Sequence, residues 1–257
     1  MIRFGVCATF DKLNDIMDAG FDYIEPKLSY VAAMSDDEFE EAEKRIAASP
    51  LQAEAFNGFL PSALKIVGEH VDMDAIAAYA DKALGRAARL GGKVAVLGSG
   101  KSRCIPNGFP RDTAIRQLRE VFCLCAAIGD KYGIAVALEP LNHRETNLIN
   151  TVAEALEICR LADHPNGKCL ADFFHVSQSG ESLNAIRNSG NRIIHIHLAN
   201  PNRDMPVSET DINLCHQWAQ ALKDCGYEGR LSLEGHYAPD YKADITRTRK
   251  ILDLFNA

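Results

Sequence analysis

Four ionisable residues stand at the ends of apolar runs in the second half of the chain. The runs are IAVALE with Glu139, KCLADF with Asp172, RIIHIHLA with His197 and RLSLE with Glu234. Taken singly, each residue fits a helix cap, a surface ion pair or a hydrogen-bonded core position. Together, at equivalent ends of consecutive strands, they predict three clustered carboxylates beside one imidazole. A divalent cation would relieve the repulsion within such a cluster, and this oxygen-rich set favours Mn²⁺, Mg²⁺ or Co²⁺.

The elements that must position these residues alternate along the whole chain. Short β-rich runs are separated by amphipathic segments that begin at capping residues or end at glycine. This alternation predicts βα units and a parallel sheet. The expected strands are residues 2–7, 21–25, 51–56, 93–98, 134–139, 168–173, 192–199 and 230–234. The expected helices include residues 35–49, 72–92, 112–133, 151–164 and 211–226.

Eight such units predict an α/β fold, a (β/α)₈ TIM barrel that forms a single domain over residues 1–257. The active site of such a barrel lies at the carboxyl ends of the strands, where the four ionisable residues would converge. A doubly wound open sheet is the rival fold. It usually carries a glycine fingerprint after its first strand, and the corresponding stretch, CATFDKLND, contains no glycine.

Composition excludes several other classes of protein. The formal net charge of −7 disfavours a protein that grips a nucleic-acid backbone. The 8 cysteines lie mostly in apolar contexts, which indicates reduced structural thiols and a cytoplasmic protein. We expect neither a signal peptide nor a membrane-spanning segment, because no apolar run is long enough.

Four motifs carry a resemblance to a known family. They are LEPLNHRE (138–145), DFFH (172–175), HIHLANPNR (195–203) and LSLEGH (231–236). In this order on consecutive strands, the chain resembles the xylose isomerase-like barrel superfamily, in particular the D-tagatose 3-epimerase-like sugar epimerases and isomerases. The resemblance runs from the first strand to the last, but its specific motifs lie in the second half.

The resemblance implies a site with one divalent metal ion, Mn²⁺ in the first place, and no other cofactor. The implied ligands are Glu139, Asp172, His197 and Glu234. The implied substrate is a small-molecule ketose or keto-sugar, whose metal-bound carbonyl would acidify the adjacent C–H through an ene-diolate. Glu139 and Glu234 would be the catalytic acid/base pair on opposite sides of the substrate. No nucleic acid or membrane partner is implied, and a homo-oligomer is compatible with the fold.

The resemblance also assigns substrate contacts. His175 and Arg203 would hold substrate oxygens, and Glu145 would contact a hydroxyl group. His195 and His197 point to the same face of a strand, because side chains alternate along it. We expect His197 to be the ligand and His195, one layer deeper, to bond a polar side chain of a neighbouring strand.

The rim of the site departs from the family pattern. NRDMPVSETDIN (202–213) lacks the usual glycine-rich stretch and aromatic residue, and Gly235 and His236 follow the last glutamate, so the substrate stays open. The segment GSGKSRCIPNGF (98–109) is either a flexible lid with solvated Lys101 and Arg103 or a substrate contact through Lys101. Asn57 and Glu25 also follow strands. Each is expected either to contact the substrate or to support another site residue.

Three other functions remain open at this point. A metal-dependent lyase or dehydratase would use the same metal and proton abstraction but expel a leaving group. An AP endonuclease would require extra histidines after strands three and four and an Asp-x-His after strand seven, whereas these places hold Asn57, Gly98 and Ser99, and Arg203-Asp204-Met205. A non-catalytic binding protein would not require the acid/base pair.

Overall fold

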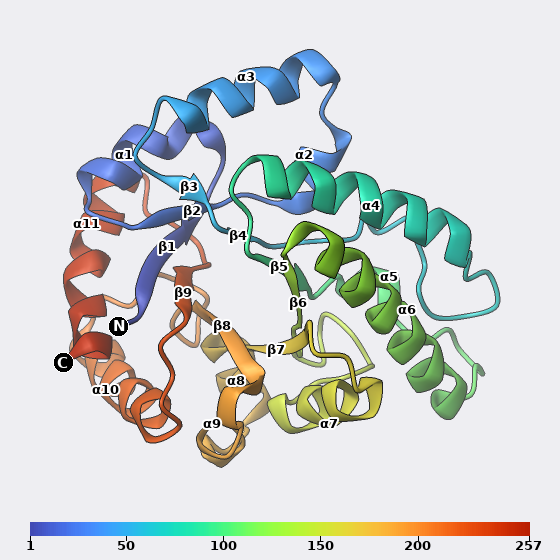
Figure 1. Ribbon diagram of the computed structural model, residues 1–257. Helices are drawn as coiled ribbons and strands as arrows, with labels where there is room; N and C mark the ends of the chain where they lie inside the picture. Colours follow the sequence, from blue (N-terminus) through green and yellow to red (C-terminus); the bar gives the residue numbers. More distant parts are fainter.

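The computed structural model describes residues 1–257 as a parallel barrel surrounded by helices (Figure 1). The hydrogen-bonded strand order is β3-β2-β1-β9-β8-β7-β6-β5-β4, and every pair is parallel. The strands are β1 (Arg3–Cys7), β2 (Tyr23–Glu25), β3 (Gln52–Ala53), β4 (Ala55–Phe56), β5 (Val94–Leu97), β6 (Ala135–Leu138), β7 (Gly167–Asp172), β8 (Ile193–Leu198) and β9 (Arg230–Leu233). This arrangement confirms the (β/α)₈ barrel predicted from the sequence.

The third expected strand, residues 51–56, is divided at Glu54. Its first part, β3, pairs with β2, whereas its second part, β4, pairs with β5. The carbonyl oxygen of Glu54 accepts hydrogen bonds from the backbone N–H groups of Lys93 and Val94. The nine strands therefore correspond to the eight expected ones, because the third expected strand is divided into two short strands. The first of these pairs with β2 and the second with β5.

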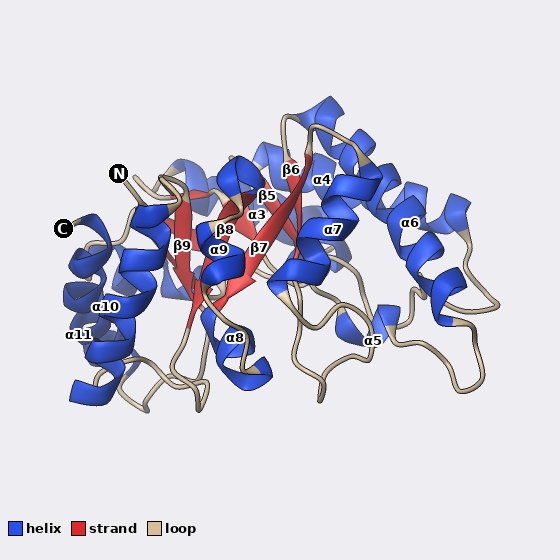
Figure 2. Ribbon diagram, turned by 90° about the horizontal axis from the view of Figure 1, so that it is seen from below, coloured by secondary structure: helices blue, strands red, loops and turns tan.

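Helices enclose the strands, and short helices follow several strand ends. The longer ones are α3 (Asp36–Ala47), α4 (Met73–Arg89), α6 (Arg111–Tyr132), α7 (Val152–Ala162), α10 (Glu209–Asp224) and α11 (Tyr241–Leu252). The shorter ones are α1 (Leu13–Asp18), α2 (Leu28–Ala33), α5 (Gly100–Arg103), α8 (Phe173–Ser179) and α9 (Asn184–Arg187), with 3₁₀ turns η1 (Phe10–Lys12), η2 (Gly190–Arg192) and η3 (Asp253–Asn256). Figure 2 shows α5 and α8 near the end of the barrel toward which the strands run.

Local sequence explains where the longer helices begin and end. Ser35 and Thr151 form capping boxes with the glutamates three residues later, at the start of α3 and α7. Gly133 ends α6 in the left-handed conformation, with φ of 66°, which glycine adopts without a steric penalty. The five helices expected from the sequence are all present.

Two apolar layers fill the molecule. Between strands and helices lies a core cluster of 63 buried residues. Inside the barrel lies a smaller cluster: Tyr23, Ala55, Val94, Val96, Ala137 and Leu170. The Tyr23 hydroxyl lies 2.7 Å from Ser232 Oγ, and Gly5 leaves the space for its ring, because a Cβ there would overlap the ring. The barrel interior is therefore packed up to the level of the site.

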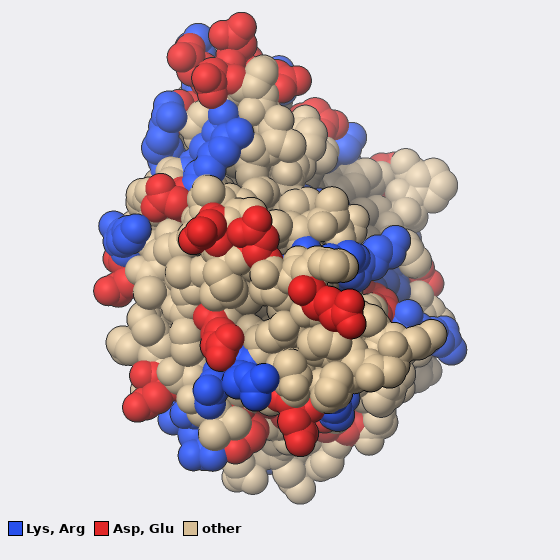
Figure 3. Space-filling model, turned by 90° about the vertical axis from the view of Figure 1, so that its right-hand side faces the viewer, with Lys and Arg blue, Asp and Glu red and all other residues tan.

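The exterior is mixed in charge. On the face drawn in Figure 3, lysine and arginine are interspersed with aspartate and glutamate. Among the ion pairs of the surface, one joins α6 to α4, where Lys131 Nζ lies 3.6 Å from Asp81 Oδ1. None of the helices has the length and apolar character that a membrane crossing requires.

Candidate active site

The structure brings the four predicted ligands together at the carboxyl ends of the last strands. Glu139 follows β6, Asp172 ends β7, His197 lies in β8 and Glu234 follows β9. One ligand atom of each lies within 4.8 Å of the others. His197 Nδ1 stands between two carboxylates, 3.3 Å from Glu139 Oε1 and 3.2 Å from Glu234 Oε2.

The surroundings of this cluster oppose its negative charge. Asp172 is fully buried, and burial raises its pKa to about 6. Burial also raises the pKa of Glu139. Burial opposes ionisation of Glu234 too, but the neighbouring His197 and Arg203 hold its pKa down at about 2. Without a cation, ionisation of Asp172 and Glu139 therefore destabilises the folded chain.

The residues of the cluster suit a divalent cation. Asp172 Oδ1 accepts a hydrogen bond from the backbone N–H of Phe174 at 2.7 Å, whereas Asp172 Oδ2 is buried without any partner. Buried polar atoms normally have partners, so this oxygen is free to bind a cation. Three carboxylates and one imidazole are a ligand set for Mn²⁺ and similar metals. Metal binding by this group stays a prediction.

Glu25, at the end of β2, supports the imidazole from below. Its carboxylate accepts hydrogen bonds from His195 Nε2 at 2.7 Å and from His197 Nε2 at 2.9 Å. All three side chains are fully buried. Of the two roles left open for Glu25, the structure favours support of another residue. His195 was expected to bond a neighbouring strand, but its partner Glu25 lies across the barrel on β2.

These contacts define how His197 would present itself to a metal. Burial opposes its charge, but Glu234 and Glu25 hold the pKa of His197 well above its usual value. In the cation-free protein a proton on His197 therefore offsets part of the negative charge. A metal would displace that proton. Because Glu25 holds the Nε2–H, the Nδ1 lone pair would then point into the cluster.

His175 presents a hydrogen-bond donor beside the cluster. It lies in the first turn of α8, three residues after Asp172, and its Nδ1 accepts a hydrogen bond from the backbone N–H of Asn142 at 3.1 Å. The opposite nitrogen, Nε2, is buried without a partner and lies 3.6 Å from Asp172 Oδ2. An imidazole that accepts at Nδ1 carries its proton at Nε2, so His175 can donate to a bound oxygen.

Arg203 and Glu145 lie together at the rim, as their expected common role requires. Arg203 donates to Glu145 Oε1 at 2.7 Å and to Glu234 Oε2 at 3.4 Å. Its guanidinium also lies over the Phe174 ring, 4.8 Å from the centroid, a cation–π contact that limits its movement. No sequence signal pointed to Phe174, although it lies within the DFFH motif.

The two remaining predicted substrate contacts differ in position. Asn57, just after β4, donates its side-chain N–H to Glu234 Oε1 at 3.0 Å, so it orients the carboxylate whatever else it contacts. Lys101 is exposed on α5 and its side chain has no hydrogen bond to the cluster. A substrate contact by Lys101 stays a prediction.

The expectation of a solvated Arg103 is wrong. Its side chain is fully buried and donates to the carbonyl oxygens of Leu97, Glu139 and Ile149, at 3.4, 2.8 and 3.4 Å. Arg103 therefore ties the end of β5 to the backbone of Glu139. Gly98 is a second supporting residue that the sequence did not reveal, because a Cβ there would collide with Glu139 Oε2.

Sequence comparison relates the chain to known sugar epimerases over part of its length. The chain resembles the D-psicose 3-epimerase of Ruminiclostridium cellulolyticum, with 31% identity over 128 residues, which is 48% of this chain and 40% of that protein. It also resembles the 3-dehydro-D-guloside 4-epimerase of Escherichia coli, with 28% identity over 122 residues, 47% of this chain and 45% of that protein. Each match thus spans less than half of the curated relative.

Solved structures show the same fold over the whole chain. A D-psicose 3-epimerase determined in the presence of D-fructose superposes with a TM-score of 0.83 at 20% identity and covers 100% of both chains. An L-ribulose 3-epimerase superposes with a TM-score of 0.84 at 21% identity, over 99% of this chain and 94% of that one. The sequence model described as xylose isomerase-like TIM barrel matches residues 13–254, and the chain therefore belongs to the xylose isomerase-like TIM-barrel family.

Proposed function

We propose that the protein is a divalent-metal-dependent epimerase or isomerase of ketoses or keto-sugars. The observation that carries this proposal is the pair Glu139 and Glu234, whose carboxylates approach His197 Nδ1 from different strands at 3.3 and 3.2 Å. The names of the relatives, ketose 3-epimerases and a 3-dehydro-D-guloside 4-epimerase, support the same class of reaction.

The ligand set supports Mn²⁺ as the metal, held by Glu139, Asp172, His197 and Glu234. When bound, the cation polarises a substrate carbonyl and lowers the pKa of the neighbouring C–H. The chain contributes the orientation of these ligands through Glu25, Asn57 and Gly98.

The acid/base pair performs the proton transfers. One of the two carboxylates, Glu139 or Glu234, takes the proton from the carbon next to the carbonyl. The other delivers a proton to the opposite face of that carbon, which inverts its configuration, while delivery to the neighbouring carbon converts a ketose into an aldose. Since one C–H bond breaks and another forms, the product is an isomer of the substrate.

Donors around the cluster would hold the substrate during these transfers. His175 Nε2–H and the Arg203 guanidinium, positioned beside Asp172 and Glu234, would bind the oxygens on which negative charge develops. Glu145, already paired with Arg203, would accept a substrate hydroxyl. The 8 unpaired cysteines support a reducing, cytoplasmic setting for this reaction.

Deuterium exchange tests the proposal. The protein with Mn²⁺ is incubated in D₂O with a panel of ketoses, 3-keto-glycosides and sugar phosphates, and C–H exchange is followed by NMR and mass spectrometry. We expect Glu139→Gln and Glu234→Gln each to slow exchange at least about 1,000-fold. Glu41→Gln, an exposed carboxylate on α3, is the matched control and should exchange at the wild-type rate.

Two outcomes would contradict parts of this proposal. Normal exchange in both glutamate variants would exclude the acid/base pair. Exchange accompanied by loss of water from the substrate would instead indicate the lyase or dehydratase reaction, which begins with the same proton abstraction.

A further inference from the structure

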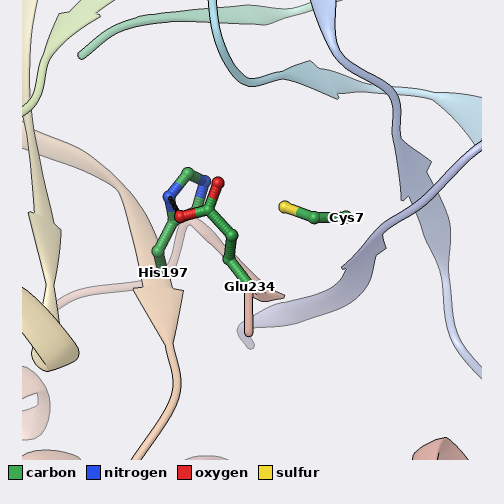
Figure 4. A group of neighbouring side chains, drawn as sticks. All are labelled: Cys7, His197 and Glu234. Atoms are coloured by element: carbon green, nitrogen blue, oxygen red, sulfur yellow. Dashed lines mark ion pairs between the residues drawn. The ribbon is translucent and has the colours of Figure 1, made fainter. Parts of the chain in front are cut away.

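Cys7 places a thiol beside the predicted metal ligands. It is the last residue of β1, half-buried, and unpaired. Its Sγ, one ring nitrogen of His197 and one carboxylate oxygen of Glu234 all lie within 4.8 Å of one another. Figure 4 shows the sulfur pointing toward the Glu234 carboxylate and the His197 ring. This group shares two members with the four-ligand cluster but contains neither Glu139 nor Asp172.

The backbone around Cys7 is held in place, so the thiol stays near these residues. The Cys7 carbonyl oxygen accepts the Tyr237 hydroxyl at 3.0 Å, and β1 pairs on one side with β2 and on the other with β9. His197 is likewise held by Glu25. Because His197 is held in place, the Cys7 and Glu234 side chains would have to adjust to bring the three ligand atoms to one ion.

The chemistry of this group differs from that of the four-ligand cluster. Thiolate and imidazole ligands select thiophilic cations, whereas carboxylates suit Mg²⁺ and Mn²⁺. We propose that Cys7, His197 and Glu234 form a second cation site, which overlaps the first and takes a thiophilic divalent cation such as Zn²⁺ or Cd²⁺. This inference rests on the proposed function only in that the two sites share His197 and Glu234.

Binding at the second site would exclude binding at the first. The Cys7 S–H bond breaks and a sulfur–metal bond forms, while His197 gives up the ring proton that it carries without a cation, and both protons leave to solvent. Because His197 and Glu234 are then engaged toward β1, Glu139 and Asp172 are left without a cation. Thiophilic metals should therefore compete with Mn²⁺ and inhibit whatever reaction the Mn²⁺ form performs.

Titration with Cd²⁺ tests the second site directly. Wild-type protein should bind one Cd²⁺ and develop the ultraviolet charge-transfer absorption of a cadmium–thiolate bond. Cys7→Ser should lose this absorption and bind Cd²⁺ at least about tenfold more weakly, with Mn²⁺ affinity changed less than about threefold. Asp172→Asn should keep the absorption, because Asp172 is not part of the second site.

Cys104→Ser is the matched control. Cys104 is exposed and lies near the Glu145 carbonyl oxygen, at 3.7 Å, but belongs to no candidate ligand group. This variant should keep the charge-transfer absorption. An absorption lost in Cys104→Ser and kept in Cys7→Ser would overturn the proposal, as would a wild-type protein that binds Cd²⁺ without any thiolate absorption.

Two further measurements keep the test decisive. Mn²⁺ binding by Cys7→Ser shows whether its fold and first site are intact. If that variant does not fold, cadmium NMR of the wild-type protein replaces it, since a sulfur ligand shifts the resonance strongly and a site of oxygen and nitrogen alone would refute the inference. Cadmium–thiolate absorption without deuterium exchange would support the second site and contradict the proposed function. Deuterium exchange without cadmium–thiolate absorption would support the proposed function and contradict the second site.

Discussion

The two ends of the barrel treat buried acidic groups in opposite ways. We call the amino ends of the strands the floor of the barrel and their carboxyl ends the mouth. At the floor, Glu54 lies between β3 and β4 and accepts hydrogen bonds from Arg3 at 2.6 Å and from Arg230 at 2.7 Å. Arg3 begins β1 and Arg230 begins β9. At the mouth, three carboxylates share one imidazole, and Asp172 Oδ2 has no hydrogen-bond partner.

The difference shows what each end is built for. At the floor the chain supplies its own cations, so the carboxylate stabilises the joint between the divided third strand and its neighbours. At the mouth the chain supplies fewer cations than carboxylates, and a bound metal would complete the balance. Strand β9 takes part at both ends, because Arg230 at its amino end binds Glu54 and Glu234 just after its carboxyl end joins the predicted ligands.

Asp172→Asn should produce the largest change in metal binding. It removes one carboxylate ligand, and we expect Mn²⁺ affinity to fall more than about 100-fold, measured by calorimetry or by electron paramagnetic resonance. The metal-free variant should be more stable than the metal-free wild type near pH 7, because a buried charge is removed. If the metal-free variant were instead less stable than the metal-free wild type, the chain's own cationic groups would already offset the negative charge at the mouth, as they do at the floor.

The pH dependence of that stability difference follows from the same residue. Burial raises the pKa of Asp172 to about 6 in the folded protein, so the folded state binds more protons than the unfolded state below this pH. Metal-free wild type should therefore lose stability relative to Asp172→Asn as the pH rises from about 4 through 6, by on the order of 3 kcal/mol. Urea unfolding at several pH values measures the difference, and a pH-independent difference would contradict it.

Gly98→Ala should disturb the mouth by steric means alone. The added Cβ collides with Glu139 Oε2, so the carboxylate must move. A displacement of a catalytic group by about 1 Å costs about 100-fold in rate. Exchange kinetics give the readout. Gly85→Ala in α4 is the control, because a Cβ there comes no closer than 3.4 Å to the Tyr132 hydroxyl; it should exchange normally.

Glu25→Gln should weaken Mn²⁺ binding less than Asp172→Asn does. An amide cannot accept from both histidines as the carboxylate does, so His197 loses its fixed orientation and Mn²⁺ affinity should fall about 10- to 100-fold. The loss should appear at saturating substrate as a requirement for more Mn²⁺, with the maximal rate largely restored by excess metal. A rate that stays low at any Mn²⁺ concentration would place Glu25 in the chemistry itself.

Glu54→Gln should affect the floor only. Arg3 is half-exposed, so the loss is modest, about 1–2 kcal/mol in the free energy of unfolding, measured by urea denaturation. Mn²⁺ affinity should be unchanged. If Mn²⁺ affinity fell together with stability, the separation between floor and mouth would not hold.

The sequence predicted the barrel and the residues that converge at its mouth, because strand ends can be read from apolar runs that stop at ionisable residues. It did not predict the partners that hold those residues. The contact between His195 and Glu25 crosses the barrel, and strand periodicity gives only the direction of a side chain. Arg103 resembled a solvated loop cation, since the three carbonyl oxygens it binds come together only in the folded chain.

The hydrogen bond between Glu25 and His197 shows that the two halves of the barrel contribute different residues to the site. All four predicted ligands come from the half after residue 134, whereas Glu25, Asn57 and Gly98 come from the half before it. The second half carries the predicted ligands, and residues of the first half hold them in alignment. A fragment that keeps only the later half would retain every ligand and yet lose the alignment that makes them a site.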